Sequence, residues 1–483
     1  MHAPPVQDIL VEGTRIAALG PDLGARAGVG ATVIDATGRM AIPGFVNAHY
    51  HSHDVLAKGL FEGQPLELWS LHSAPMGANR SREEVRLRTL LGALECLRSG
   101  ITTVQDMINL VPLREDYVDT VLDAYAEAGI RVVCSLAVRD VPQVDTVPRL
   151  RERLPSDIQA VVGDRAADGR VQLDFIARQF ERRPATSRLH WAISPSAPQR
   201  CTPELLKGVA DLSSRLGLPV YTHVYESKWQ ALHARLTCGD FDGSYIAYLE
   251  NAGLLNDRLT IVHGVWLTPE EIDRLAAGGA AVALNTVSNL KTQSGIAPIV
   301  TLRRAGVRLA MGCDNCSCSD VQNIFQAMKL FCLFSAVGDP TPGDEPAAEA
   351  VRVATEGGAR TAGLGDRIGA LRPGMKADLA LIDLADPAFV PFNSAARQLV
   401  YSETGRGIET VIVDGRIVMR DRRIATIDEA SLHREVAAAM PAFRRDYDAV
   451  AAGIRHALEP MRSAHADALA QDIGLDRFIR RER

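Results

Sequence analysis

Short apolar runs recur along the chain, separated by longer stretches in which apolar residues have helical spacing. Seven of these runs lie at residues 102–104, 131–136, 190–193, 219–222, 259–263, 281–284 and 307–311, and an eighth ends in the segment around His49. Strands that alternate with helices predict parallel βα units. Eight such units predict an α/β fold, a (β/α)8 TIM barrel, in which reactive residues belong at the carboxyl ends of the strands.

The two ends of the chain carry a different pattern. Residues 9–19 and 411–418 each contain two apolar runs around an acidic residue followed by glycine, which is typical of a β-hairpin. We predict that these hairpins join in one small β-domain built from both termini. From Glu429 onward the sequence is rich in alanine and arginine with helical spacing, which predicts a terminal helical extension.

Five residues share a setting that indicates a metal site, because each follows a short apolar run: His49, His51, His223, His263 and Asp314. Side chains at i and i+2 of a strand share a face, so His49 and His51 can reach the same cation. Imidazole and carboxylate ligands suit zinc or iron rather than calcium or magnesium. We predict one divalent ion held by His49, His51, His223 and Asp314, with His263 at or next to the shell. Zinc is preferred, and iron(II) is the alternative.

A single histidine at a strand end is more often a packing residue than a ligand. The chain has only 12 histidines, however, and the other eight lack this combination of strand end and motif. His53 comes nearest, because it continues the alternation from His51, but it falls beyond the expected end of the strand. We therefore leave His53 outside the predicted shell.

Glu226 lies three residues beyond His223, on the turn that leaves the strand. From there it can reach a metal-activated water without binding the ion, which is the position of a general acid and base. The alternative is a solvated glutamate at the start of a helix.

Composition narrows the setting without naming a substrate. Lys and Arg number 53 against 59 Asp and Glu, a net charge of −6, and no basic block predicts a nucleic-acid partner. No signal core and no stretch near the roughly 18 apolar residues of a membrane span is visible, so we expect a cytoplasmic protein without a membrane partner. Three of the eight cysteines, Cys313, Cys316 and Cys318, flank Asp314, and we predict reduced, buried thiols.

A series of motifs in order resembles one known family. They read PGFVNAHYH, GITTVQDM, THVYES, VHGVWLT, VSNLKTQSGIAP, GCDNCSCSDVQN and LRPGMKADLALID, with a further segment from Lys58 to Trp69. The chain resembles the amidohydrolase superfamily, in the branch of cytosine deaminase, S-adenosylhomocysteine deaminase and the triazine hydrolases. The resemblance runs from Ile9 to about Leu432.

This resemblance implies a domain organisation. A β-sandwich is expected from residues 1–43 and 367–425, a barrel from 44–366, and the helical extension from 426–483. The chain begins at the second strand expected of the sandwich, so we expect either a missing edge strand or a misassigned start codon. In the resembled deaminases, the residue matching Glu226 shuttles a proton and the one matching His263 polarises the attacked centre. The residue matching Asp314 touches the metal and handles the water proton.

Two departures from the family pattern bear on the substrate. Many relatives have a His-Ala-Pro loop where this chain has Ser194–Arg200, so Ser196 replaces a histidine; Leu284, Asn285 and Thr286 stand where relatives often have His-Asn-Pro or His-Cys-Pro. A site without these imidazoles gains little from a hydroxyl-rich substrate, so a small free ring is expected to be preferred over its nucleoside. The predicted substrate contacts are Tyr50, Trp69, Ser196, Gln199, Trp266 and Asn285.

Three functions remain open from the sequence. The first, which we prefer, is hydrolytic deamination of an amino-substituted N-heterocycle such as a purine, pyrimidine, pterin or triazine. The second is hydrolysis of another C–N, C–Cl, urea or amide-type bond in a related small molecule. The third is a catalytically silent scaffold, against which the complete ligand set argues. A small-molecule substrate and a homo-oligomer are the expected partners; the sequence does not identify the substrate or the role of the extension.

Overall fold

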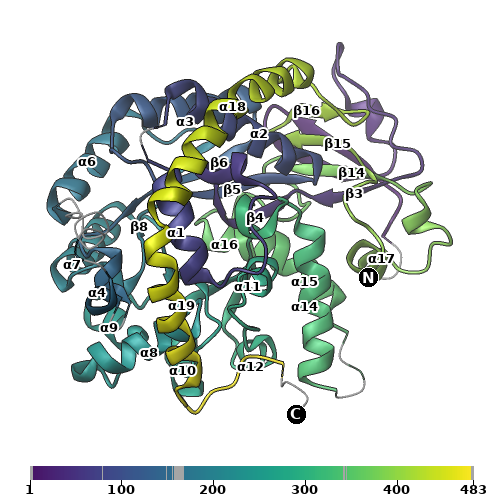
Figure 1. Ribbon diagram of the computed structural model, residues 1–483. Coiled ribbons are helices and arrows are strands. Elements are labelled where there is room, and N and C mark those ends of the chain that lie inside the picture. The colour runs from purple at the N-terminus through teal and green to yellow at the C-terminus, as the bar shows by residue number, and fades with distance from the viewer. Residues whose placement is uncertain are drawn as a thin grey trace.

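The computed structural model describes residues 4–78, 80–147, 150–154, 156, 168–340, 343 and 345–479. Its centre is a ring of parallel strands with helices packed around it (Figure 1). The eight strands of the ring are β4 (Phe45–His51), β5 (Ile101–Ile108), β6 (Arg131–Val138), β7 (Leu189–Trp191), β9 (Val220–Val224), β10 (Leu259–His263), β11 (Ala281–Leu284) and β12 (Arg308–Met311).

The ring closes through two short contacts. Strands β4 to β7 pair in parallel, as do β9 to β12, and a parallel bridge between Ile193 and Val220 joins the two halves. On the other side, β13 (Asp314–Asn315) follows β12 and pairs in parallel with β4, with Asp314 opposite Tyr50 and Asn315 opposite His51. The predicted eight-stranded barrel is confirmed. The contact that closes it includes Asp314, one of the predicted metal ligands.

A register shift in β4 decides which of its side chains enter the barrel. The four residues of β4 from Asn47 to Tyr50 lie opposite only three of β5, from Val104 to Asp106, which is the signature of a β-bulge. Val46 and Ala48 belong to the small-residue cluster inside the barrel, whereas Tyr50 packs with the layer between strands and helices. The bulge therefore turns the odd-numbered histidines inward at the end of the strand.

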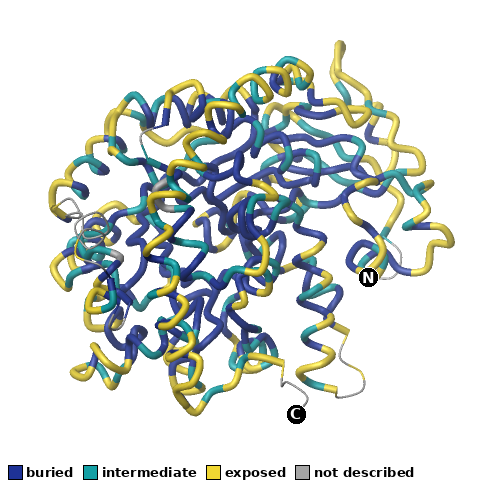
Figure 2. The backbone as a smooth tube through the Cα atoms, viewed as in Figure 1, coloured by how far each residue is buried: buried dark blue, intermediate teal, exposed yellow. Residues whose placement is uncertain are grey.

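Helices cover the outside of the barrel, and most residues that they turn toward the strands are buried (Figure 2). Local sequence fixes where several begin: Thr268 caps α10 with Glu271 in a reciprocal capping box, and Thr202 caps α7. The helices are α1 (Leu66–Met76), α2 (Arg82–Arg98), α3 (Glu115–Ala128), α4 (Leu150–Arg153), α6 (Gly169–Arg182), α7 (Pro203–Leu216), α8 (Lys228–Thr237), α9 (Tyr245–Asn251), α10 (Pro269–Ala277), α11 (Thr286–Lys291), α12 (Ile299–Arg304), α13 (Cys316–Ser319), α14 (Ile324–Gly338), α15 (Ala347–Arg352), α16 (Gly358–Thr361) and α17 (Ala395–Tyr401).

A small antiparallel β-domain lies beside the barrel. Its five-stranded sheet has the order β17-β16-β15-β14-β3, and a hairpin of β1 and β2 packs against it through a cluster that includes Ile9, Leu379 and Ile412. Both hairpins expected from the sequence are present; the boundaries at residues 43, 366 and 425 stay a prediction. The strands are β1 (Asp8–Glu12), β2 (Arg15–Gly20), β3 (Arg39–Pro43), β14 (Leu379–Asp383), β15 (Ile408–Val413), β16 (Arg416–Arg420) and β17 (Arg423–Ile424).

The helical extension expected from Glu429 onward forms α18 (Glu429–Gly453) and α19 (Arg455–Ala470). These two helices cross the front of the barrel in Figure 1 and pack on α1, α2, α4 and α8. Apolar residues of α19, among them Met461 and Ala464, share a cluster with Leu68 of α1 and Trp229 of α8. The extension is therefore part of the barrel's wall at this face.

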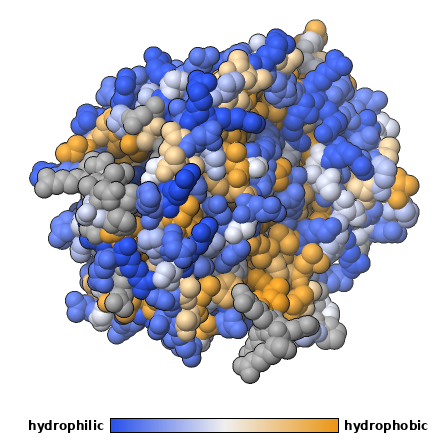
Figure 3. Space-filling view, in the orientation of Figure 1, coloured by the Kyte–Doolittle hydropathy of each residue, from blue (hydrophilic) through white to orange (hydrophobic). Residues whose placement is uncertain are grey.

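The surface adds little to the question of partners. In Figure 3 this face is mostly hydrophilic, with hydrophobic side chains gathered toward its lower edge. Leu333 and Val337 of α14 are among the exposed apolar residues. No helix in the described part of the chain combines the length and apolarity needed to span a bilayer. All eight cysteines are buried and free of disulfides, as expected.

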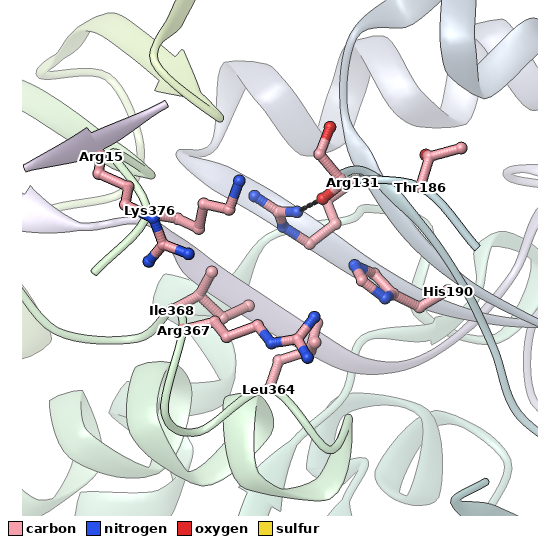
Figure 4. A pocket seen from close by; sticks show the side chains of 9 residues that line it. Arg15, Arg131, Thr186, His190, Leu364, Arg367, Ile368 and Lys376 are labelled. Carbon is pink, nitrogen blue, oxygen red and sulfur yellow. Dashed lines mark hydrogen bonds between the residues drawn. The ribbon is translucent and has the colours of Figure 1, made fainter. Parts of the chain in front are cut away.

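A buried ion pair joins the barrel to the β-domain. Arg131, at the start of β6, donates from Nε and Nη2 to the carboxylate of Asp378, with distances of 2.8–3.0 Å, and both side chains are almost fully buried. Beside it lies a cavity of about 370 Å³ lined by cationic side chains (Figure 4). Of these, Lys376 forms an ion pair with Asp414 at 2.8 Å.

Removing Asp378 leaves the buried Arg131 with the more distant carboxylate of Asp414, 3.8 Å from its Nη2. We expect Asp378→Asn to lower the free energy of unfolding by about 3–5 kcal/mol, the usual effect of breaking a buried pair. Denaturant unfolding followed by circular dichroism measures this change. The matched control is Asp116→Asn, which breaks the exposed pair with Arg114 and should change stability little. Equally small effects of both substitutions would show that the contact between the barrel and the β-domain does not depend on the Arg131–Asp378 pair.

Candidate active site and metal centre

The five predicted metal-site residues meet at the carboxyl end of the barrel. Nε2 of His49 and Nε2 of His51 each lie 3.5 Å from Oδ1 of Asp314, and the Nε2 atoms of His51 and His223 are 3.3 Å apart. Nε2 of His263 is 3.9 Å from Oδ2 of Asp314. Two groups of potential ligands overlap at His49: one with His51 and His223, the other with His263 and Asp314. The strand-end spacing thus brings all five together.

Contacts behind the cluster orient the histidine rings. Nδ1 of His51 lies 2.7 Å from the carbonyl of Met107, and Nδ1 of His223 lies 2.6 Å from the carbonyl of Ser196. Because a carbonyl can only accept, both rings carry their proton on Nδ1 and present the Nε2 lone pair to the centre. This arrangement, a ligand histidine held through its far nitrogen, is typical of metal sites.

The remaining groups also fit a cation. Both ring nitrogens of His49 and Nε2 of His263 are buried without a hydrogen-bond partner in the described chain. Such buried orphan atoms are costly unless something binds them. Burial and the neighbouring histidine charges hold the pKa of His223 well below its ordinary value, and burial lowers that of His263 to about 4. These neutral imidazoles and one carboxylate suit a divalent metal.

The carboxylate is itself held in place and ionised. Oδ2 of Asp314 accepts a hydrogen bond from Ser288 Oγ at 2.6 Å, and Oδ1 accepts from the amide of Asn315 at 2.8 Å. Burial alone would raise the pKa of Asp314, but His49, His263 and His51 together hold it well below its ordinary value. The site therefore contains a fixed anion beside the buried rings of His49 and His263, whose pKa values are lowered.

Backbone strain is concentrated at the same place. His263, Asp314 and Tyr225 have φ values of 77°, 62° and 54°, in the left-handed region that non-glycine residues rarely adopt. Strained residues of this kind persist where the surrounding structure holds them, and they cluster at functional sites. Here they turn the chain sharply at the ends of β9, β10 and β12.

Glu226 faces the cluster from the loop after β9. Its Oε2 lies 3.4 Å from Nε2 of His263, and its backbone amide is fixed by Gln230 Oε1 at 2.9 Å. Burial, followed by the charges of Asp314 and Glu67, raises the pKa of Glu226 well above its ordinary value, while Arg200 opposes the shift. A buried carboxyl of raised pKa beside a metal site can both take up and release a proton.

A cavity opens from this cluster, and the structure sorts the predicted substrate contacts. Trp69, Ser196 and Gln199 line the cavity. Tyr50 does not, because the bulge in β4 directs its ring toward α2, where a Cβ on Gly92 would meet its hydroxyl at 1.7 Å. Trp266 is also absent from the lining, as is Asn285, whose amide nitrogen contacts the carbonyl of Ala283 at 3.4 Å. His53 lines the cavity but belongs to neither ligand group.

Several residues of the cavity were not anticipated from the sequence. Glu67, Asn109, Arg139, Arg200 and Gln230 all contribute to its lining. Arg200 is the last residue of the Ser194–Arg200 loop, which also carries Ser196. Glu67 lies in the segment from Lys58 to Trp69, which is one of the motifs shared with the resembled family. Its charge alone, however, does not distinguish a cavity residue from a solvated one.

The helical extension reaches one wall of the cavity. Nδ1 of His465, on α19, lies 3.1 Å from Oε2 of Glu67, whose other oxygen accepts a hydrogen bond from Ser227, the residue after Glu226. Lys228 donates to the carbonyl of Leu469 at 2.7 Å. The extension thus supports both α1 and the loop that carries the proposed acid and base.

The tail beyond α19 supports a second wall. Arg477 donates to the carbonyls of Val265 and Leu267, at 3.0 and 2.7 Å, directly after β10. The ring of Phe478 packs edge-on against Trp266, with centroids 5.2 Å apart, and Trp266 Nε1 donates to the carbonyl of Ser294. These contacts account for the position of Trp266 in a covered, structural setting.

Comparison with known proteins assigns the fold and site to a class. Residues 40–418 match the model of the Amidohydrolase family. The chain belongs to this family and, like its deaminase relatives, is a hydrolase that acts on C–N bonds. It is 34% identical over 414 residues to a 5-methylthioadenosine/S-adenosylhomocysteine deaminase of Thermococcus kodakarensis, covering 85% of this chain and 89% of that protein.

Two further proteins extend the comparison. A 5'-deoxyadenosine deaminase of Methanothermobacter thermautotrophicus is 32% identical over 425 residues, covering 87% of this chain and 91% of the relative. Among solved structures, an adenosine deaminase from Xanthomonas campestris with bound zinc has a TM-score of 0.79 and 27% identity, covering 91% of this chain and 94% of the other. The fold and the resemblance inferred from the sequence are thereby confirmed.

The cluster predicts a definite metal stoichiometry. Purified protein should contain one divalent ion per chain, because the described part of the site offers no lysine to bridge a second ion; β7, where such a lysine is expected, reads Leu189, His190 and Trp191. Elemental analysis checks the number, and His51→Ala should lower it well below one. Two ions per chain, or full activity without any, would contradict the single-ion site.

Proposed function

We propose that the protein is a zinc-dependent deaminase that hydrolyses the amino group from an N-heterocyclic ring. The observation that carries this proposal is the position of Glu226, a carboxyl of raised pKa 3.4 Å from His263 and beside the ligand cluster. Zinc is preferred because neutral imidazoles with one carboxylate form a typical site for it. The zinc-bound relative from Xanthomonas campestris supports the same choice.

The residues of this chain can be assigned to the steps of the reaction. When bound, a divalent ion supplies the Lewis acidity that makes water a nucleophile near neutral pH. Glu226 accepts the proton that water loses as its oxygen bonds to the ring carbon. The same carboxyl then delivers that proton to the exocyclic nitrogen, which leaves as ammonia while the ring carbon keeps the oxygen. Atoms and charge balance, so one residue can serve both transfers.

The other residues position these groups. Asp314 stays ionised beside His49 and His51 and is assigned to the metal and, as the resembled deaminases imply, to the proton that remains on the attacking oxygen. His263 lies between Glu226 and Asp314, where we assign it to the attacked ring carbon, as the resembled deaminases imply. Ring stacking by Trp69, whose Nε1 is fixed by Ser317 Oγ at 2.9 Å, is the proposed substrate contact on the outer side.

The substrate class follows from two lines of support. The relatives named above are deaminases of adenosine-derived compounds, which favours an aminated purine-like ring. At the same time Ser196 lines the cavity where many relatives have a histidine, which removes one partner for a ribose hydroxyl. We therefore propose a small aminated ring rather than an unmodified nucleoside. A homo-oligomer and a cytoplasmic location stay predictions from the sequence.

Glu226→Gln tests the proton-transfer role directly. The substitution keeps shape and hydrogen bonding but removes the titrating carboxyl, so kcat should fall at least about 100-fold while bound zinc stays at the wild-type level. Ammonia release and elemental analysis on the same sample give both values. Glu204→Gln, an exposed carboxyl at the start of α7, is the control and should keep full activity. Loss of zinc together with activity would instead make Glu226 a ligand or a support.

A panel of substrates tests the reaction and its ring. We expect ammonia from aminated purines, pyrimidines, pterins or triazines, and a higher kcat/KM for the best free ring than for adenosine or 5'-deoxyadenosine, because the imidazole at Ser196 is missing. Chloride or alkylamine release from triazines, measured alongside, covers the alternative bonds. A clear preference for the nucleosides would contradict the proposed preference for a free ring. Release of chloride without ammonia would show that the protein hydrolyses a C–Cl bond and is not a deaminase.

A further inference from the structure

A second cavity lies at the opposite end of the barrel from the metal centre, between the barrel and the β-domain (Figure 4). Arg131 stands at the start of β6 and His190 near the start of β7, whereas the metal ligands lie at or after the ends of their strands. From the β-domain side come Arg15 of β2 and Lys376, which form an antiparallel bridge with each other. The cavity therefore touches both parts of the molecule, and it shares no lining residue with the cavity beside Glu226.

This second cavity has an apolar floor and a polar, solvent-accessible side. Leu364 and Ile368 are almost fully buried and belong to the cluster of small residues inside the barrel. Thr186 and Ser187, which also line the cavity, are exposed. The volume of about 370 Å³ is far above the roughly 10–15 Å³ that a single water needs. A hydrated ion of several atoms can therefore enter from solvent and fit.

Positive charge predominates around the cavity. Its described lining contains no acidic residue and four cationic ones, namely Arg15, Arg131, Arg367 and Lys376. Two of these cations are neutralised from behind, since Arg131 has the carboxylate of Asp378 and Lys376 has that of Asp414, each at 2.8 Å. The charges of the other two decide what the cavity can bind.

Those two arginines have no close counter-ion in the described part of the chain. Arg15 donates from Nη1 to the carbonyl of Gly374 and has no described carboxylate within 4.0 Å. The one described carboxylate within that distance of Arg367 belongs to Asp366, at 4.0 Å from Nε and with its side chain 81% exposed. A single surface arginine of this kind is ordinary, but two that face one cavity leave it with a net positive charge.

A buried nitrogen without a partner points to a ligand as well. Nε2 of His190 is buried and has no hydrogen-bond partner among the described residues, and the ring lines the cavity (Figure 4). Such orphan atoms are costly unless something binds them. Burial, and then the positive charge of Arg131, lower the pKa of His190 to about 4, and Arg367 adds to the shift. The ring is therefore neutral near pH 7 and lies in a positive field.

The arrangement of these groups favours a tetrahedral oxyanion over a planar one. Guanidinium groups are preferred partners of phosphate and carboxylate oxygens. In Figure 4, Arg15 and Lys376 lie on one side of the opening and Arg367 lies below it. Arg131 and His190 lie on the remaining sides. A phosphate presents oxygens in all these directions, and the neutral imidazole can either donate to one of them or accept from the hydroxyl of monohydrogen phosphate.

We propose that this cavity is a phosphate-binding site, in which a phosphate group joins Arg15 of the β-domain to His190 of the barrel and Arg367 of the connection between α16 and β14. Arg131 and Lys376 keep their carboxylate partners and add positive potential. Because the bound group contacts both parts of the molecule, it stabilises the folded protein by linkage. The site takes no part in hydrolysis, so it stands whether or not the protein is a deaminase.

Titration with two phosphate compounds tests the site. Inorganic phosphate and glycerol 1-phosphate are titrated separately into the wild-type protein by calorimetry, with the ionic strength held constant by potassium chloride. We expect saturable binding and a Tm that rises with ligand concentration. Tighter binding of inorganic phosphate identifies the free ion as the ligand, and tighter binding of glycerol 1-phosphate identifies a phosphomonoester. Absence of saturable binding by both compounds would overturn the proposal.

Substitutions locate the bound phosphate on the two arginines. Arg15→Gln and Arg367→Gln should each raise the Kd at least about 10-fold, because each removes a charge-assisted contact. Arg367→Lys, which keeps the charge, should recover part of the loss. Arg372→Gln is the matched control, since it removes an exposed positive charge from the same connection but does not line the cavity. Equal Kd values for all three glutamine variants and the wild-type protein would refute the assignment.

The metal centre is the competing site for a phosphate. His51→Ala removes a predicted metal ligand at the other end of the barrel and should leave the phosphate Kd unchanged. Binding that is lost in His51→Ala but kept in Arg367→Gln would belong to the metal centre and would sink the proposed site. Thermal unfolding separates binding from folding: Arg367→Gln should match the wild-type Tm without phosphate and fall below it when phosphate is present.

Discussion

The site depends on how the barrel closes. The two residues of β13 pair with the end of β4, and this contact sets Asp314 opposite Tyr50 and Asn315 opposite His51. The same contact that completes the ring therefore places the only carboxylate of the ligand cluster against the histidine pair. Because β4 carries a bulge just before this point, its two histidines face inward where the closing strand arrives. Architecture and ligand geometry are consequently one constraint, and neither can shift without the other.

The charges of the ligand cluster explain why the strained backbone at His263 and Asp314 is tolerated. The cluster buries one ionised carboxylate beside His49, His223 and His263, whose pKa values burial lowers. Ring nitrogens of His49 and His263 have no hydrogen-bond partner among the described residues. Such a set is unfavourable by itself and becomes favourable around a dication. The left-handed backbone of His263 and Asp314 is part of the same balance. Small residues such as Ala48, Ala283 and Ala310 are buried inside the barrel below the ligand cluster, and their packing supports these strained turns.

The sequence encoded the parts of this arrangement that are local. Alternation in β4 and the apolar runs before His223, His263 and Asp314 predicted the barrel and the cluster, because strand ends of a parallel barrel meet at one rim. Periodicity could not reveal the bulge, so the direction of Tyr50 was unpredictable. Nor could it place Trp266, which Phe478 of the distant tail covers. Arg139 and Arg200 likewise share a cavity through hydrogen bonds between two loops that are far apart in the chain.

The C-terminal extension ties the end of the chain to the state of the cavity. His465 contacts Glu67, and Lys228, next to the Ser227 that donates to Glu67, binds the carbonyl of Leu469, so α19 docks on groups that face the ligand. Peripheral helices open locally at a smaller free-energy cost than a barrel strand. A ligand that orders Glu67 must therefore also favour the docked form of α19, since linkage acts in both directions. The protection of the α19 amides against hydrogen exchange therefore reports whether a ligand occupies the cavity at the end of the barrel.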